Sequence, residues 1–147
     1  MLIRQAIETD LPQVLELLKG MDEEDVVTLD QAQTIWCRMN EYPYYKVFVV
    51  EDNKDLIGTC CLIIIDNLGH LGTKLAVAES MIVSKKYRGC GVGGKLMQFI
   101  MEKAKEENCY KLMLSSNKKR YLAHKFYEQL GFQQHGTSFI VKVAKND

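Results

Sequence analysis

The sequence lacks an excess of charge of either sign, because its 19 Lys and Arg residues are matched by 19 Asp and Glu residues. A zero formal charge gives no global electrostatic reason to expect nucleic acid as a partner. Long apolar runs are missing as well, since none approaches the ~20 residues that a membrane-spanning helix needs. The first ten residues, MLIRQAIETD, lack the apolar core of a signal peptide. We therefore expect a cytoplasmic protein that binds neither membranes nor nucleic acid.

Patterns typical of disulfides and metal sites are also missing. The five cysteines are odd in number, include the adjacent pair Cys60 and Cys61, and show no CxxC spacing. This argues against both a disulfide framework and a zinc site. His70 and His135 have no partner at a spacing typical of metal ligands. We expect reduced cysteines that mostly pack, and no metal.

Repeats, Pro- or Ser-rich linkers and low-complexity tracts are absent, so a single domain over residues 1–147 is the simplest partition. Strands are predicted at 2–7, 47–50, 56–65, 74–84, 112–115 and 139–143. Helices are predicted from an Asp10 N-cap to Gly20, with Gln13 as its capping-box partner, and over 29–39, 92–104 and 119–130. This order predicts a mixed α/β sheet with helices on both faces.

The sequence RGCGVG at 88–93 follows a strand-like stretch and opens the most strongly amphipathic helix. The first amides of a helix have no carbonyl partners and share the positive end of its dipole, so they can hold a pyrophosphate. Glycines at this point let phosphates approach the backbone closely. A turn this short is also compatible with a purely structural role, and other features must decide its function.

Two familiar phosphate-binding patterns do not fit this turn. A dinucleotide-binding fold has its glycines after the first strand and an acidic residue about 20 positions later. Here the glycines come late in the chain and that context is missing. A P-loop ends in Gly-Lys followed by Ser or Thr, whereas this chain has Leu96 after Gly94 and Lys95.

A run of four acids at 22–25 allows two interpretations. It is either a solvated loop or a surface that attracts a cationic substrate.

A second motif lies about 30 residues after the turn, at 123–132, and reads AHKFYEQLGF. Together, the two motifs in this order resemble the GNAT acetyltransferase superfamily, over roughly residues 76–132. The segment 115–120 with Ala123 and His124 also resembles, more modestly, the aminoalkylphosphonate N-acetyltransferase branch. The resemblance implies the GNAT acyl-CoA N-acyltransferase fold, with a mostly antiparallel central sheet. It also implies transfer of an acetyl group from acetyl-CoA to an amine.

The resemblance further implies a set of residues that bind acetyl-CoA. The backbone of the strand before the turn would pair with the pantetheine arm as an added strand does. The turn would hold the pyrophosphate, with Arg88 adding charge near it. The alternatives are that Arg88 is a surface residue of the turn and that Asn117 is a helix cap. The residues implied are Met81, Ile82, Val83, Arg88, Gly89, Cys90, Gly91, Val92, Gly93, Gly94 and Asn117.

Two catalytic residues follow from the same resemblance. Tyr127 would donate a proton to the departing thiolate, since a phenol with an ordinary pKa of about 10 is protonated at neutral pH. Glu79 would take a proton from the amine, directly or through water. The alternatives are a Tyr127 that only packs and a Glu79 that is simply an exposed carboxylate. His124 allows a role in proton transfer, in contact with substrate or metal, or as a surface or capping residue. Cys90 is interpreted as a small filler.

The acceptor is expected to be a small amine, such as an aminoalkylphosphonate or a polyamine, and a homodimer is possible by analogy. Two alternatives stay open: acetylation of a protein N-terminus or lysine, and a regulatory module that binds CoA without catalysis.

Overall fold

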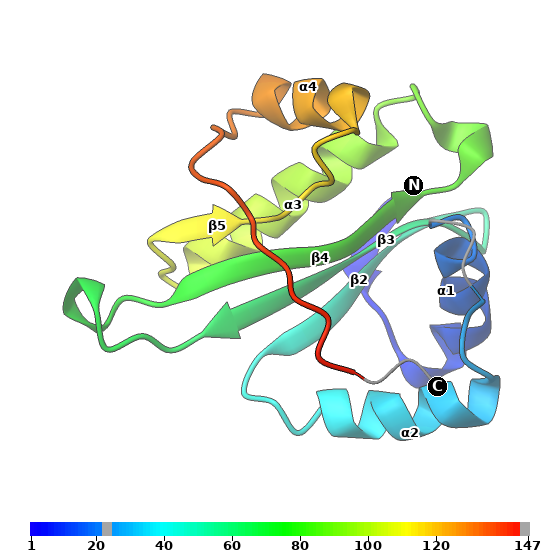
Figure 1. Ribbon diagram of the computed structural model, residues 1–147. Helices are drawn as coiled ribbons and strands as arrows, with labels where there is room; N and C mark the ends of the chain where they lie inside the picture. Colours follow the sequence, from blue (N-terminus) through cyan, green and yellow to red (C-terminus); the bar gives the residue numbers. More distant parts are fainter. Residues whose placement is uncertain (22–24, 145–147) are drawn as a thin grey trace. The chain divides into compact units, whose positions relative to one another are not determined.

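The computed structural model describes residues 1–21 and 25–144 and divides the chain into two compact units, Met1–Leu114 and Ser115–Asp147. The first unit holds most of the secondary structure (Figure 1). Its strands are β1 (Leu2–Gln5), β2 (Tyr45–Asp52), β3 (Asp55–Ile65), β4 (Leu75–Val83) and β5 (Lys111–Met113). Its α-helices are α1 (Leu11–Leu18), α2 (Leu29–Met39) and α3 (Val92–Glu106). The predicted strands and helices of this unit are thereby confirmed, α2 with both of its bounds.

The sheet has the order β1-β2-β3-β4-β5. The first four strands pair antiparallel, and β5 pairs parallel to β4, so the expected mixed and mostly antiparallel sheet is confirmed. Asn53 and Lys54 have positive φ values of 49° and 72°, which make the tight turn between β2 and β3. On its β5 side, β4 pairs only from Leu75 to Val77. Within the described residues of this unit, positions 78–83 of β4 have no strand beside them on that side.

Helices cover both faces of this sheet (Figure 1). Val47 and Val49 belong to the buried cluster that includes the α1 residues Val14 and Leu17. Phe48 lies between them in the strand and therefore points to the opposite face, where its ring is 5.3 Å from that of Phe99 in α3. The alternation within β2 thus assigns α1 and α3 to opposite faces, as predicted.

The start of α1 differs from the expected capping box. Asp10 is the N-cap residue, but its side chain makes no capping hydrogen bond. Its carboxylate instead accepts hydrogen bonds from the Arg4 guanidinium at 2.7 and 3.0 Å and from the Ile7 amide at 2.8 Å. Gln13 does not close a box either, because its Oε1 accepts from the Leu56 amide at 2.8 Å. Both side chains connect α1 to neighbouring strands, which is a tertiary role that local sequence does not reveal.

The second unit contains α4 (Tyr121–Gln129). Gly131 follows the helix with a φ of 95°, which confirms it as the residue that ends the predicted helix. The predicted strand at 139–143 is wrong, since none of these residues is in a strand and the side chains of Phe139, Ile140, Val141 and Val143 are at least 78% exposed. Strand propensity forms a strand only where a partner strand supplies the ladder.

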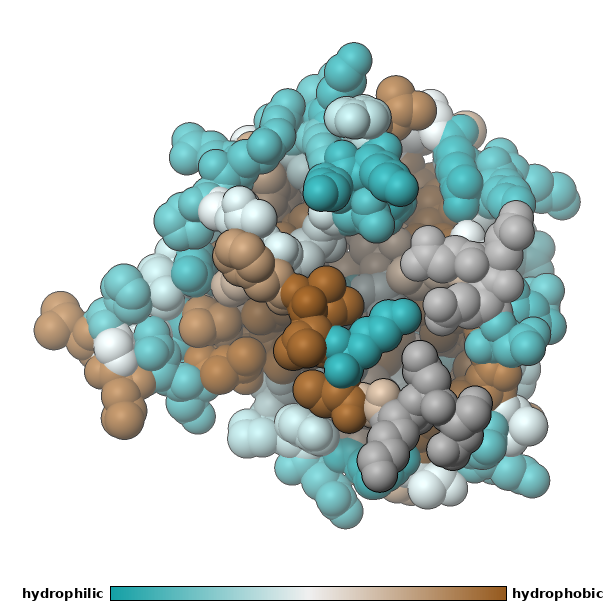
Figure 2. Space-filling view, in the orientation of Figure 1, coloured by the Kyte–Doolittle hydropathy of each residue, from teal (hydrophilic) through white to brown (hydrophobic). Residues whose placement is uncertain are grey.

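The tip of the β3–β4 connection carries apolar side chains on the surface (Figure 2). Leu68 and Leu71 are fully exposed there, and Leu71 has a φ of 59°.

Candidate functional site

The glycine turn, defined as residues 88–94, follows β4 and includes the first three residues of α3. Gly89 and Gly91 have φ values of 77° and 80°, a left-handed conformation that favours glycine. The amides of Arg88 and Cys90 donate to the carbonyl oxygens of Lys85 and Tyr87. Five amides of the turn have no backbone acceptor among the described residues, namely those of Gly89, Gly91, Val92, Gly93 and Gly94. Unpaired amides at the start of a 15-residue helix form a binding surface for an anion.

Arg88 holds the turn against the strand that precedes it. Its Nε donates to the Val83 carbonyl oxygen at 3.1 Å, so the guanidinium is anchored at the end of β4. Lys85, Lys86 and Lys95 are exposed residues close to the turn in sequence and add positive charge on its two sides. The turn therefore combines free amides, a fixed backbone and an excess of cationic side chains.

The free edge of β4 leads into this turn. A β-bulge opposite Cys60 places three residue steps on β4 against two on β3, because Cys61 pairs with Glu79 and Thr59 with Ile82. Ser80 has a φ of 51° within the bulge. Within the described part of this unit, the backbone groups of 78–83 that face away from β3 have no strand partner, and an edge of this kind can bind an extended ligand as an added strand.

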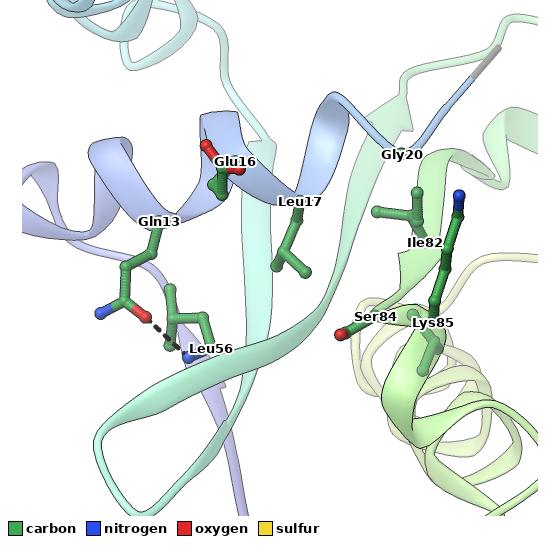
Figure 3. A pocket seen from close by; sticks show the side chains of 9 residues that line it. Gln13, Glu16, Leu17, Gly20, Leu56, Ile82, Ser84 and Lys85 are labelled. Carbon is green, nitrogen blue, oxygen red and sulfur yellow. Dashed lines mark hydrogen bonds between the residues drawn. The ribbon is translucent and has the colours of Figure 1, made fainter. Parts of the chain in front are cut away.

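A hollow of about 310 Å³ lies on the α1 side of the same strand end (Figure 3). Leu17 and Ile82 line it from opposite sides, and the side chains of Glu16 and Lys85 lie at its rim. A Cβ atom added to Gly20 would lie 3.1 Å from Cδ1 of Ile82, so glycine keeps the hollow open. This hollow was not predicted from the sequence, because the hollow depends on how α1 packs against β4 and no local motif indicates it.

Glu79 lies on the face of the sheet that α1 and α2 cover, and its side chain is exposed. Its register partner on β3 is Cys61, whose partner on β2 is Val47, and Tyr45 lies two residues earlier on the same face of β2. We call Tyr45, Cys61 and Glu79 the Glu79 face. Burial, Cys61, Glu79 and Tyr42 raise the pKa of Tyr45. Burial and Glu79 raise the pKa of Cys61 to about 12.

The structure thus brings Glu79 together with Tyr45, a residue that sequence reasoning did not single out. The only signal in the sequence was an aromatic residue two positions before a predicted strand, and pairing it with Glu79 required the register of three strands.

The second unit holds Asn117, His124 and Tyr127. The Asn117 Oδ1 accepts from the Lys119 amide at 2.9 Å, so its side chain closes the turn before α4. The His124 Nε2 donates to the Asn117 carbonyl oxygen at 2.9 Å, which fixes this ring at the start of the helix. The ring of Tyr127 lies 5.1 Å from that of Phe126 and 5.7 Å from that of Phe132. Tyr127 is thereby oriented by an aromatic cluster at the end of α4.

The acidic run at 22–25 lies outside the described residues except for Asp25, which is exposed. In the described parts of the chain, no three His, Cys, Asp or Glu side chains are grouped as metal ligands would be. Over the same residues, every helix is too short or too polar to cross a membrane.

Comparison with known proteins gives one consistent result. Residues 11–132 match the acetyltransferase (GNAT) family. A glucosamine 6-phosphate N-acetyltransferase of Trypanosoma brucei brucei is 30% identical over 134 residues, which cover 90% of this chain and 89% of that protein. The N-alpha-acetyltransferase 30 of Schizosaccharomyces pombe is 32% identical over 95 residues, covering 64% of this chain and 61% of its own. A putative acetyltransferase from Agrobacterium tumefaciens str. C58 superimposes with a TM-score of 0.92 at 31% identity, covering 97% of this chain and 99% of its own.

Proposed function

The chain belongs to the acetyltransferase (GNAT) family, and from this premise we propose that it transfers the acetyl group of acetyl-CoA to a primary amine of a small molecule. The observation that carries the proposal is the glycine turn, whose five free amides lie at the end of a strand with an unpaired edge. Acetyl-CoA supplies an activated acyl group and carries a pyrophosphate and an extended pantetheine arm. The turn and the edge of β4 offer the backbone groups that such a molecule needs.

In this proposal, the edge of β4 at Met81, Ile82 and Val83 binds the pantetheine arm through backbone groups. The five free amides of the glycine turn bind the pyrophosphate, while the Arg88 and Cys90 amides keep the turn folded. Arg88 also anchors the turn on Val83 and adds charge near the phosphates. Asn117 contributes through the turn that it closes before α4.

The reaction needs one base and one acid. The amine nitrogen attacks the thioester carbonyl carbon, the carbon–sulfur bond breaks, and the thiolate leaves. Glu79 takes the proton that the amine must lose, directly or through water, since an alkylammonium with a pKa of about 10 is not a nucleophile. Tyr127 gives a proton to the thiolate. No covalent enzyme intermediate is required, so Cys90 has no nucleophilic role.

Further features of the whole protein also belong to the proposal. The family match runs from residue 11 to residue 132 and therefore covers parts of both compact units, which supports one functional domain over 1–147. Leu68 and Leu71 offer an apolar contact for a second copy in a homodimer. The cytoplasm stays the predicted compartment.

Release of CoA thiol from acetyl-CoA tests the proposal. The acceptors are aminoalkylphosphonates, polyamines, aminoglycosides, glucosamine 6-phosphate and peptides with free N-termini or lysines. We expect release with at least one small amine. Release with peptides alone would replace the small acceptor by a protein, in line with the second relative. Binding of acetyl-CoA with release on no amine would leave a CoA-binding regulatory module.

A further inference from the structure

The Glu79 face also indicates the kind of amine that the protein accepts, an inference that rests on the proposed function. The strands β2, β3 and β4 contain one basic residue among them, Lys46. Lys46 lies on the opposite face, because it alternates with Tyr45 and its Nζ is 4.4 Å from the centre of the Tyr44 ring. These three strands therefore offer no cation beside Glu79 that could bind an anionic group of a substrate.

The helices on this face add no such cation. The α1 sequence, LPQVLELL, has no basic residue. In α2 the single basic residue is Arg38, which is exposed and lies two positions from Trp36. Trp36 and Met39 pack against the buried cluster, so Arg38 points away from the sheet. Lys19, just after α1, is paired with Glu16 at 2.9 Å.

The groups that do surround Glu79 suit an ammonium ion. Tyr45 and Tyr42 form an edge-to-face pair with ring centres 5.6 Å apart, and both rings belong to the segment that enters and starts β2. Cys61 pairs with Glu79 and lies two residues from Ile63, the partner of Tyr45, so Tyr45 and Glu79 share one face of the sheet. Cys61 itself packs against the buried cluster. A carboxylate next to aromatic rings is a recognised way to bind an alkylammonium, through charge and through cation–π attraction.

We propose that the acceptor is a cationic amine without a phosphate, bound as an ammonium ion between Glu79 and the Tyr45 ring, with Tyr45 as a specificity-determining residue. Glu79 then accepts the proton of that ammonium, and the neutral nitrogen attacks the thioester. Glu79 is one of the charges that raise the pKa of Tyr45, so the two side chains lie within electrostatic range of each other. The proposal separates this chain from the relatives that are named for glucosamine 6-phosphate.

The decisive experiment compares two acceptors that differ only in the phosphate. We expect glucosamine and spermidine to give a kcat/KM at least about 10-fold higher than glucosamine 6-phosphate does. A preference for glucosamine 6-phosphate would overturn this inference and leave the acetyltransferase function intact. Thiol release with none of these three acceptors and with no amine of the wider panel would overturn the proposed function itself.

Variants of two adjacent tyrosines test the role of Tyr45. Tyr45→Leu removes the ring, and we expect the KM for the preferred amine to rise about 10-fold while the KM for acetyl-CoA stays unchanged. Tyr45→Phe keeps the ring and should change the amine KM less than about threefold. Tyr44→Leu is the matched control on the opposite face and should leave the amine KM unchanged. An unchanged amine KM in folded Tyr45→Leu would refute the role, and if that variant does not fold, the comparison of the two glucosamines still decides the acceptor class.

Discussion

The glycine turn and the Glu79 face are built from different chemistry. The turn uses main-chain amides of consecutive residues, held by left-handed glycines and by the bond from Arg88 to Val83. The Glu79 face uses side chains from three strands, which come together only through the register of the sheet. Main-chain recognition tolerates many side chains around it, whereas side-chain recognition changes with each substitution. In the proposed function the turn binds the donor and the Glu79 face binds the acceptor, so substitutions on that face can change the acceptor while the donor site is kept.

Glu79→Gln should have the largest effect, and it addresses the Glu79 face alone. The amide cannot take a proton, so we expect kcat to fall by about 10²- to 10³-fold at neutral pH. The KM for acetyl-CoA should stay within about twofold, because the turn and the edge of β4 are untouched. Steady-state thiol release with varied acetyl-CoA measures both constants. A large rise in the acetyl-CoA KM would show that the two regions are not separate.

Tyr127→Phe tests whether the donor half of the reaction depends on a side chain as well as on main-chain amides. Loss of the phenol proton should lower kcat by about 10- to 10²-fold and weaken acetyl-CoA binding less. The ring of the phenylalanine keeps the contacts with Phe126 and Phe132, so the fold of the second unit should be preserved. An unchanged kcat would remove Tyr127 from the mechanism. The KM for the amine should stay unchanged and is the internal control.

A buried thiol in the strands of the Glu79 face makes the free energy of unfolding depend on pH in the alkaline range. Burial, Cys61 and Glu79 raise the pKa of Cys60 from 9.0 to about 12, and this residue is fully buried. Above pH 9 the unfolded chain loses this thiol proton while the folded chain keeps it, so the unfolding free energy falls as pH rises. We expect a loss of about 2 kcal/mol between pH 9 and 11 from this group.

Denaturant titrations under reducing conditions measure this pH dependence. Cys60→Ala should make the decline of stability between pH 9 and 11 smaller, while the part that comes from Cys61 remains. Val49→Ala truncates another fully buried residue without removing a thiol, and it should lower stability equally at all pH values. If the unfolding free energy fell with pH equally steeply in the wild type and in Cys60→Ala, the raised pKa of Cys60 would be contradicted.

The success of prediction from the sequence also differs between segments of neighbouring residues, such as the glycine turn, and sites assembled from several strands, such as the Glu79 face. The glycine turn and α2 were predicted because the residues that define them are neighbours in the chain. Asp10 was correctly predicted as the N-cap residue, but the side-chain partners of Asp10 and Gln13 were not, since Arg4 and Leu56 come from strands on either side of α1 in sequence.

The Glu79 face shows more clearly why contacts between strands could not be predicted from the sequence. Strict alternation along β4 would place Ile82 and Glu79 on opposite faces, but the bulge at Ser80 puts them on the same one. Tyr45 could be paired with Glu79 only once that register was known. The strand predicted at 139–143 failed for a related reason, because β-branched composition says nothing about whether a partner strand is present.

Gly91→Ala should have the smallest effect of the four changes, and it addresses the glycine turn alone. A methyl group at this position meets no atom within 4 Å, so the change introduces no clash. It does disfavour the φ of 80°, at about 1 to 2 kcal/mol for a left-handed alanine. The free turn can relax to another conformation, but the arrangement of amides that binds pyrophosphate must then be restored on binding. We therefore expect the KM for acetyl-CoA to rise about 10-fold with little change in the amine KM.

Gly136→Ala is the matched control for this change, since Gly136 is also open within 4 Å but does not have a positive φ. It should leave both KM values unchanged. If Gly91→Ala instead raised the amine KM and spared that of acetyl-CoA, the glycine turn would belong to the acceptor and the division between the two regions would be reversed. If neither constant moved, the left-handed conformation of Gly91 would serve only to start α3, and the anion would have to be held by the remaining amides of the turn.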